Sequence, residues 1–199
     1  MQRLLIWSGI GAWRAESATV EFGSQSLRAA GTQLGIEPVP YRLDYELEIG
    51  ESWITRRLHV AATGEGWARE LDLSHDGAGA WTAESTEEGA APLPAPGGEV
   101  DAVRGARDCD LGLSPLTNLM PVRRHELHLR RAEMDFLMAW VSVPDLGLHP
   151  SRQRYEHVGR RDGRSVVFYV GEHRSFVGEL ELDEHGLVLL YPELARRLA

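Results

Sequence analysis

Hydrophobic and polar residues alternate with a period of two along most of this chain. The clearest case is residues 41–49, where every second side chain is apolar or aromatic and the intervening positions are mostly charged. Residues 179–183 repeat the pattern, and a short turn at 184–186 leads into the apolar run 187–191. A period of two is typical of a strand with one buried face, and two such runs around a turn indicate a hairpin.

Other segments add to this picture of short strands separated by turns. The dipeptides Asp76-Gly77 and Asp162-Gly163 are turn signals at the spacing expected of a meander. Helical periodicity is confined to residues 116–120 and 193–199. The remaining predicted strands are residues 3–7, 19–22, 53–60, 67–73, 79–83, 124–130, 136–143 and 165–170.

This many strands predict an all-β, mainly antiparallel fold with one or two short helices. An open flat sheet of this size is unfavourable, so the strands must close into a barrel, stack as a sandwich or curl into a roll. At 199 residues we expect a single domain over 1–199. A curled sheet encloses an apolar hollow, which is a common place for a ligand.

Composition removes several classes of function. The formal net charge of −9 argues against nucleic acid or an anionic membrane as a partner. Every basic residue is arginine, which excludes lysine-based catalysis and the P-loop lysine. Cys109 is the one cysteine, so the chain has no intrachain disulfide and no cysteine-based metal site. We therefore expect no metal and no cofactor.

The chain carries no recognisable targeting or membrane segment. Residues 1–13 contain a short apolar run that Ser8, Gly9 and Gly11 interrupt, unlike the apolar core of a signal peptide. No stretch approaches the ~18 apolar residues that a membrane-spanning helix needs. We expect a cytoplasmic protein without a transmembrane segment, and the sequence leaves its oligomeric state open.

Residues 108–124 form the most unusual stretch, because acids, prolines and hydroxyl residues precede paired arginines. In a strand, Asp108 and Asp110 lie on one face about 6.5–7 Å apart and Cys109 lies on the other. Such carboxylates could bind a divalent cation or act as an acid–base pair. The competing interpretation is that they hydrogen-bond the corner at 114–118, where Ser114 is expected to cap a turn.

Two further groups have candidate chemistry. If Ile54, Leu58 and Val60 point into the core, the alternation places Arg56 on the same face. There a buried acid, Asp108 or Asp110, or a ligand phosphate or sugar would have to pair with it. His125 and His128 resemble a zinc motif, but on a strand they point to opposite faces, so we interpret them as surface residues.

The whole set of motifs resembles a bacterial family, the glycolipid-binding family, formerly a domain of unknown function with a spiral β-roll fold. The resemblance covers nearly the whole chain in the expected order. Ser114 and Leu116 depart mildly from the usual Thr and Phe. The matching residues are Trp53 to Arg56, Asp108, Asp110, residues 114–118, Pro121, Arg123, Arg124, residues 153–155 and the closing Tyr191-Pro192.

This resemblance implies a spiral β-roll that binds an amphiphilic ligand, a glycolipid or another acylated molecule, and it supplies no catalytic residues. We expect a binding protein rather than an enzyme. The alternatives are a small-substrate hydrolase or isomerase that uses Asp108 or Asp110 with an arginine, and an interaction protein without a small ligand. The expected ligand-binding residues are Trp53, Arg56, Asp108, Asp110, Asn118, Arg123, Arg124, Gln153 and Tyr155.

Overall fold

In the computed structural model, which describes residues 1–172 and 175–199, fourteen strands form one sheet. The order of strands in the sheet is β7-β6-β5-β4-β3-β2-β1-β14-β13-β12-β11-β10-β9-β8. The strands of the first half are β1 (Gln2–Gly9), β2 (Arg14–Phe22), β3 (Leu27–Gly35), β4 (Tyr41–Ile49), β5 (Thr55–Gly64), β6 (Trp67–His75) and β7 (Trp81–Gly89). Those of the second half are β8 (Asp108–Leu111), β9 (Glu133–Val141), β10 (Leu148–Arg161), β11 (Arg164–Gly171), β12 (Phe176–Leu182), β13 (Val188–Tyr191) and β14 (Ala195–Arg197).

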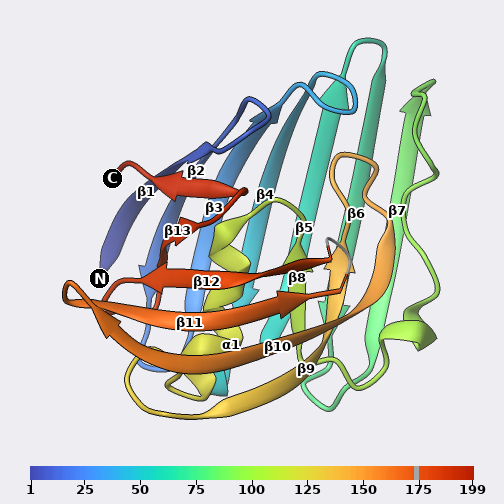
Figure 1. Cartoon of the computed structure of the whole chain (residues 1–199). Helices are drawn as coiled ribbons and strands as arrows, with labels where there is room; N and C mark the ends of the chain where they lie inside the picture. Colours follow the sequence, from blue (N-terminus) through green and yellow to red (C-terminus); the bar gives the residue numbers. More distant parts are fainter. Residues whose placement is uncertain (173–174) are drawn as a thin grey trace.

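The sheet curls so that its two halves face each other, but it does not close into a barrel (Figure 1). Neighbouring strands are antiparallel except for β8, which runs parallel to β9. Alternating side chains of both halves point into the space between them, for example Leu43 and Leu58 from one half and Val167 and Leu180 from the other, all fully buried. The predicted all-β, mainly antiparallel, curled fold is confirmed.

Residues 108–124, which we call the interior segment, occupy the space between the two halves. They comprise β8, the 3-10 helix η3 (Pro115–Asn118) and the helix α1 (Leu119–Arg124). Figure 1 shows α1 between the strands of the two halves. Leu111, Leu116, Leu119, Met120 and Val122 are each at most 1% exposed. The helical turn predicted at 116–120 is confirmed, and it fills the curl with apolar side chains.

The last strand, β14, joins the two halves of the sheet. Its residues pair with β1, with Trp7 opposite Arg197, and with β13 on the other side. The helix predicted at 193–199 is wrong. The open edges of β1 and β13 supply backbone partners that a helix would leave unsatisfied, and Leu198 N also donates to Ile6 O at 2.7 Å.

The strand predicted at 124–130 is also wrong. α1 ends at Arg124, and turns follow in which Leu127 N donates to Val122 O at 2.9 Å and Leu129 N donates to Glu126 O at 2.8 Å. Leu127 is buried, whereas Leu129 is 58% exposed, so the apparent alternation did not mark one face. The strand predicted to begin at residue 53 is β5, which begins at Thr55 instead. A 3-10 helix of three residues, η1 (Glu51–Trp53), precedes it.

Within the described parts of the chain, no helix has the length and apolar character needed to cross a membrane.

Candidate functional site

An ion pair fixes the two ends of the interior segment to each other. Arg124 Nη1 donates to Asp108 Oδ1 at 2.7 Å, and Nη2 donates to Oδ2. The side chains are 9% and 1% exposed, respectively. Burial raises the pKa of Asp108, and the Arg124 guanidinium opposes that rise. The carboxylate that the sequence offered as a catalytic group is thus engaged by an arginine.

Arg124 and its neighbour Arg123 attach the interior segment to η1. Arg124 Nη1 donates to Trp53 O at 3.0 Å, and the Arg123 guanidinium carbon lies 4.6 Å from the centroid of the Trp53 ring. The indole is buried, at 5% exposure. We call Trp53, Asp108, Arg123 and Arg124 the arginine cluster. Its cation–π contact and ion pair connect three parts of the chain.

A second polar network runs from the interior segment to β10. Asn118 Nδ2 donates to the Tyr155 hydroxyl at 2.8 Å, and that hydroxyl donates to Gln153 Oε1 at 3.0 Å. Gln153 Nε2 donates to Asp110 Oδ2 at 2.6 Å, and Thr117 Oγ1 donates to Asp110 Oδ1 at 2.7 Å. All five residues are buried. Asp110 thus accepts from the side chains of Thr117, in the corner at 114–118, and of Gln153 on β10.

A third group centres on Glu16 of β2, which the sequence analysis did not single out. Glu16 Oε1 accepts hydrogen bonds from Ser114 Oγ and from the Tyr45 hydroxyl, both at 2.7 Å. Gln33 Nε2 lies 3.5 Å from Glu16 Oε2. Ser114 also caps η3 by accepting from Leu116 N at 3.3 Å, as predicted. Glu16 thus connects the interior segment to three neighbouring strands of the first half.

The surroundings of Glu16 favour its neutral form. The side chain is fully inside the protein, and burial raises its pKa from 4.5 to about 7, against the opposing effects of its hydrogen bonds and of Arg14. Among the described residues, Gln33 Oε1 is buried without a hydrogen-bond partner. Glu16 therefore exchanges a proton close to neutral pH.

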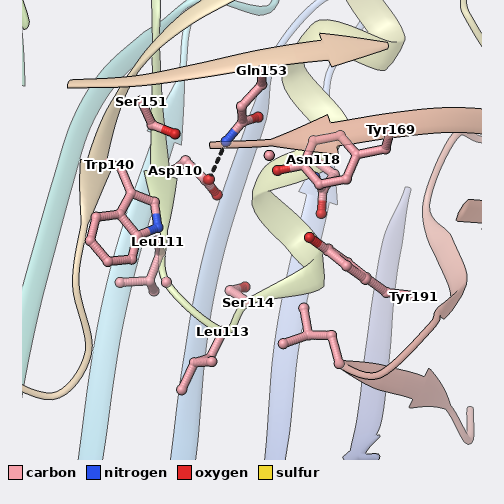
Figure 2. Close-up of a pocket in the computed structure, with 13 residues that line it drawn as sticks. Asp110, Leu111, Leu113, Ser114, Asn118, Trp140, Ser151, Gln153, Tyr169 and Tyr191 are labelled. Carbon is pink, nitrogen blue, oxygen red and sulfur yellow. Dashed lines mark hydrogen bonds between the residues drawn. The ribbon is translucent and has the colours of Figure 1, made fainter. Parts of the chain in front are cut away.

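Asp110, Asn118 and Gln153 line a small polar chamber together with aromatic side chains from the second half of the sheet (Figure 2). The enclosed space is about 30 Å³, which is room for about two water molecules. The chamber combines carboxylate, amide and hydroxyl groups with an indole and two phenol rings. Its lining residues are Asp110, Leu111, Gly112, Leu113, Ser114, Asn118, Trp140, Ser151, Gln153, Tyr169, Gly171, Tyr191 and Leu194.

A larger open depression, the mouth hollow, lies at the end of the roll where the turns β1–β2 and β3–β4 are found. Its volume is about 760 Å³. Trp13 and Ile36, on these two turns, are 58% and 48% exposed. The lining residues are Ile10, Gly11, Ala12, Trp13, Arg14, Gly35, Ile36, Glu37, Pro38, Tyr41, Leu113, Val143 and Glu193.

Leu113 is shared by the linings of the two spaces. It lines the chamber, the mouth hollow and a third, very small cavity beside Glu16. Its φ of 64° lies in the left-handed region, which is unfavourable for a side chain with a Cβ. Strained residues of this kind concentrate at functional sites. We therefore treat the hollow, the chamber and the Glu16 group, whose linings share Leu113, together as the candidate site.

The predicted site residues fall into three separate places. Asp110, Asn118 and Gln153 line the chamber, and Tyr155 supports them from behind. The arginine cluster holds the interior segment instead of lining the chamber or the hollow. Arg56 is elsewhere, on the outer surface.

The expected inward orientation of Arg56 is wrong. Ile49 of β4 pairs with Thr55 while the preceding Glu48 pairs with Arg57, so Arg56 is an extra residue in β5. This β-bulge turns Arg56 outward, where Nη1 donates to Asp76 O at 3.3 Å, and puts Thr55 inside. A bulge shifts every later side chain by one position, which strict alternation cannot anticipate.

The histidines do not gather into a metal site. No group of three or more potential metal-ligating side chains occurs in residues 1–172 and 175–199. His128 is only 2% exposed, so its interpretation as a surface residue is wrong; it packs against Gly186 beyond the end of α1. Burial lowers the pKa of His128 to about 4. The Cys109 thiol is buried and its pKa is raised to about 12, which does not suit a nucleophile.

Sequence reasoning missed Glu16 and the mouth hollow for identifiable reasons. Glu16 occupies the same face as Ala18 and Val20, but the predicted strand began only at residue 19. An acid within an apolar face is the signal that would have marked it. Trp13 and Ile36 stand outside the alternating strands, in turns that normally carry polar residues.

We expect Arg124→Ala to lower the free energy of unfolding by about 3–5 kcal/mol, because it leaves the buried Asp108 carboxylate without its cation. Urea unfolding followed by tryptophan fluorescence measures this change. The matched control is Arg130→Ala, which removes an exposed partner of Glu126 and should leave the unfolding midpoint nearly unchanged. Equal effects of the two variants would contradict the role of the ion pair.

Glu16 should make stability depend on pH. The folded protein holds a proton on Glu16 up to about pH 7, whereas the unfolded chain releases it near pH 4.5, so stability falls as pH rises between these values. Relative to Glu16→Gln, wild type should lose about 3 kcal/mol across this range. Urea unfolding at pH 4.5, 6, 7 and 8 measures the difference. A difference that stays constant over this pH range would show that Glu16 does not titrate as described.

The comparisons with known proteins agree with this architecture. The family model described as "Putative glycolipid-binding" matches residues 4–197. The crystal structure of a DUF1089 family protein from Pseudomonas aeruginosa is similar, with 26% identity, a TM-score of 0.68 and coverage of 92% of each chain. No curated protein matches the sequence. Since the match spans nearly the whole chain, the protein belongs to the glycolipid-binding family that its motifs resemble.

Proposed function

We propose that this protein binds an amphiphile, with the apolar part of the ligand in the mouth hollow and a hydroxyl-bearing head group at the polar chamber. The observation that carries the proposal is that Leu113 belongs to the lining of both spaces. One space is wide, open and partly apolar, and the other is narrow and polar. The predicted single domain over 1–199 and the cytoplasmic location are part of this proposal.

The dimensions of the mouth hollow support the first half of this proposal. Ligand sites in proteins have volumes of about 300–1,000 Å³ and are lined mainly by apolar and aromatic groups. The hollow, at about 760 Å³, lies within this range. Trp13, Ile36, Pro38 and Val143 can cover an alkyl chain, and burying these exposed side chains against it is favourable.

The chemistry of the chamber supports the second half. Carboxylate, amide and hydroxyl groups beside aromatic rings can hydrogen-bond and stack on a sugar, which presents hydroxyls at its edges and C–H groups on its faces. Asp110, Gln153 and Trp140 provide these groups. Because the enclosed space holds only about two water molecules, the head group would lie beside Leu113 with one or two hydroxyls reaching inward. Glu37 and Glu193 at the hollow disfavour an anionic head group.

Asp110, Asn118 and Gln153 thus remain the proposed ligand-binding residues. Trp53, Asp108, Arg123 and Arg124 act indirectly in this proposal, by holding the interior segment, and Tyr155 orients Gln153 and Asn118. The enzymatic alternative gains no support from Asp108, whose carboxylate is engaged by Arg124.

Octyl glucoside below its critical micelle concentration is a suitable probe. We expect saturable binding by isothermal titration calorimetry, with Trp13→Ala weakening it about tenfold because about 1.4 kcal/mol of apolar contact is lost. The matched control is Leu129→Ala, since Leu129 is also 58% exposed but does not line the hollow. Octyl sulfate, with the same chain and an anionic head group, should bind more weakly than the glucoside.

Absence of saturable binding would overturn the proposal as a whole. Equal binding of the glucoside and the sulfate would overturn the assignment of the head group. Equal effects of the Trp13 and Leu129 substitutions would remove the mouth hollow as the site.

A further inference from the structure

Two turns at the mouth of the roll carry exposed apolar side chains where each turn joins its strand. Trp13 lies in the turn between β1 and β2, and Ile36 lies in the turn between β3 and β4. They are 58% and 48% exposed, and Leu34 next to them on β3 is 40% exposed. Turns in water normally carry polar residues, so this grouping indicates a surface that contacts something apolar.

The pairing register brings Trp13 and Ile36 close together. Arg14 of β2 pairs with Gly35 of β3, so Trp13 and Ile36 are the next residues beyond the last pair on neighbouring strands. Adjacent strands are about 4.8 Å apart. The turns lie at the same end of the sheet (Figure 1), and the mouth hollow is bounded by both of them.

We propose that these two turns dock on the surface of a neutral or zwitterionic lipid bilayer, so that an amphiphile passes between the bilayer and the mouth hollow. This inference rests on the proposed function, which places the apolar part of the ligand between the same turns. Tryptophan favours the membrane–water interface, where its ring meets both apolar and polar surroundings. A few apolar side chains give weak, reversible attachment, which suits exchange of a ligand.

Charge selects the kind of surface. Glu37 follows Ile36 in its turn, and Glu193 also lines the hollow, so acids outnumber the one basic residue there, Arg14. Arg14 Nη2 donates to the backbone oxygens of Glu193 and Leu194. With a net charge of −9, the protein is repelled by anionic phospholipid. A second copy of the chain is also disfavoured as the occupant, because the pairing of two mouths would bring the acidic side chains of both copies together. A neutral bilayer surface avoids both costs.

Co-sedimentation with vesicles tests the inference. We expect the full chain to pellet with phosphatidylcholine vesicles and to pellet less when 30% of the lipid is phosphatidylglycerol. Trp13→Ser and Ile36→Ser should each lower the partition coefficient about tenfold, whereas Leu129→Ser, a control for the loss of an exposed apolar side chain, should leave it unchanged. Thermal unfolding by circular dichroism establishes that each variant is folded.

Several results would overturn the inference. The first is an unchanged partition coefficient for both Trp13→Ser and Ile36→Ser, and the second is stronger binding to the anionic vesicles than to phosphatidylcholine. The third is a dimer of the protein in sedimentation velocity without lipid that is lost in Trp13→Ser. Octyl glucoside binding, measured without vesicles, separates this inference from the proposed function. If the glucoside binds and phosphatidylcholine vesicles do not, only the docking surface is wrong. If vesicles bind and the glucoside does not, the proposed function is wrong.

Discussion

The structure depends on one constraint, which is that a curled sheet must fill its own interior. The two halves of the sheet are joined by backbone pairing of β1 with β14, and the interior segment packs between them. Its leucines fill the space, and the buried Asp108–Arg124 pair fixes its two ends. A buried ion pair is costly to break because either partner alone remains as an uncompensated charge. This requirement explains why acids, prolines and paired arginines are concentrated in residues 108–124.

The same filling determines where a ligand can bind. Because the interior segment occupies the curl, a lipid-sized cavity does not run through the described core, and the enclosed polar chamber is only about 30 Å³. Space remains at the end of the roll, where the turns of the first half extend past the interior segment at Leu113. Glu16 lies near Leu113 and accepts a hydrogen bond from Ser114. Buried polar groups are therefore present close to the open end of the roll. This arrangement is the reason for the proposal that the apolar part of an amphiphile binds in the mouth hollow and its polar part at the chamber.

Most of the fold could be predicted from alternation alone, and its failures have local physical causes. Strand β3 was not predicted, because Ala29, Ala30 and Gly31 are poor strand formers that pairing on both sides nevertheless holds extended. Pairing of β14 with β13 likewise prevailed over the helical pattern at 193–199. A β-bulge turned the Arg56 side chain to the face opposite the one predicted. Of the candidate site, the Asp-x-Asp pair singled out Asp110, and the resemblance added Asn118 and Gln153. Glu16 was missed because the predicted strand began only at residue 19. The mouth hollow could not be predicted, because its lining comes from residues far apart in the chain that only the curl brings together.

Amide hydrogen exchange with and without saturating octyl glucoside, followed by mass spectrometry of peptides, tests the central claim that the ligand lies where the hollow meets the chamber. The account predicts added protection in peptides that contain residues 10–14, 34–38 and 112–114, with the outer strands β5 and β6 unchanged. Protection confined to the outer surface around Leu4 and His59, where another depression exists, would contradict this claim. An absence of added protection while octyl glucoside is bound would contradict it as well.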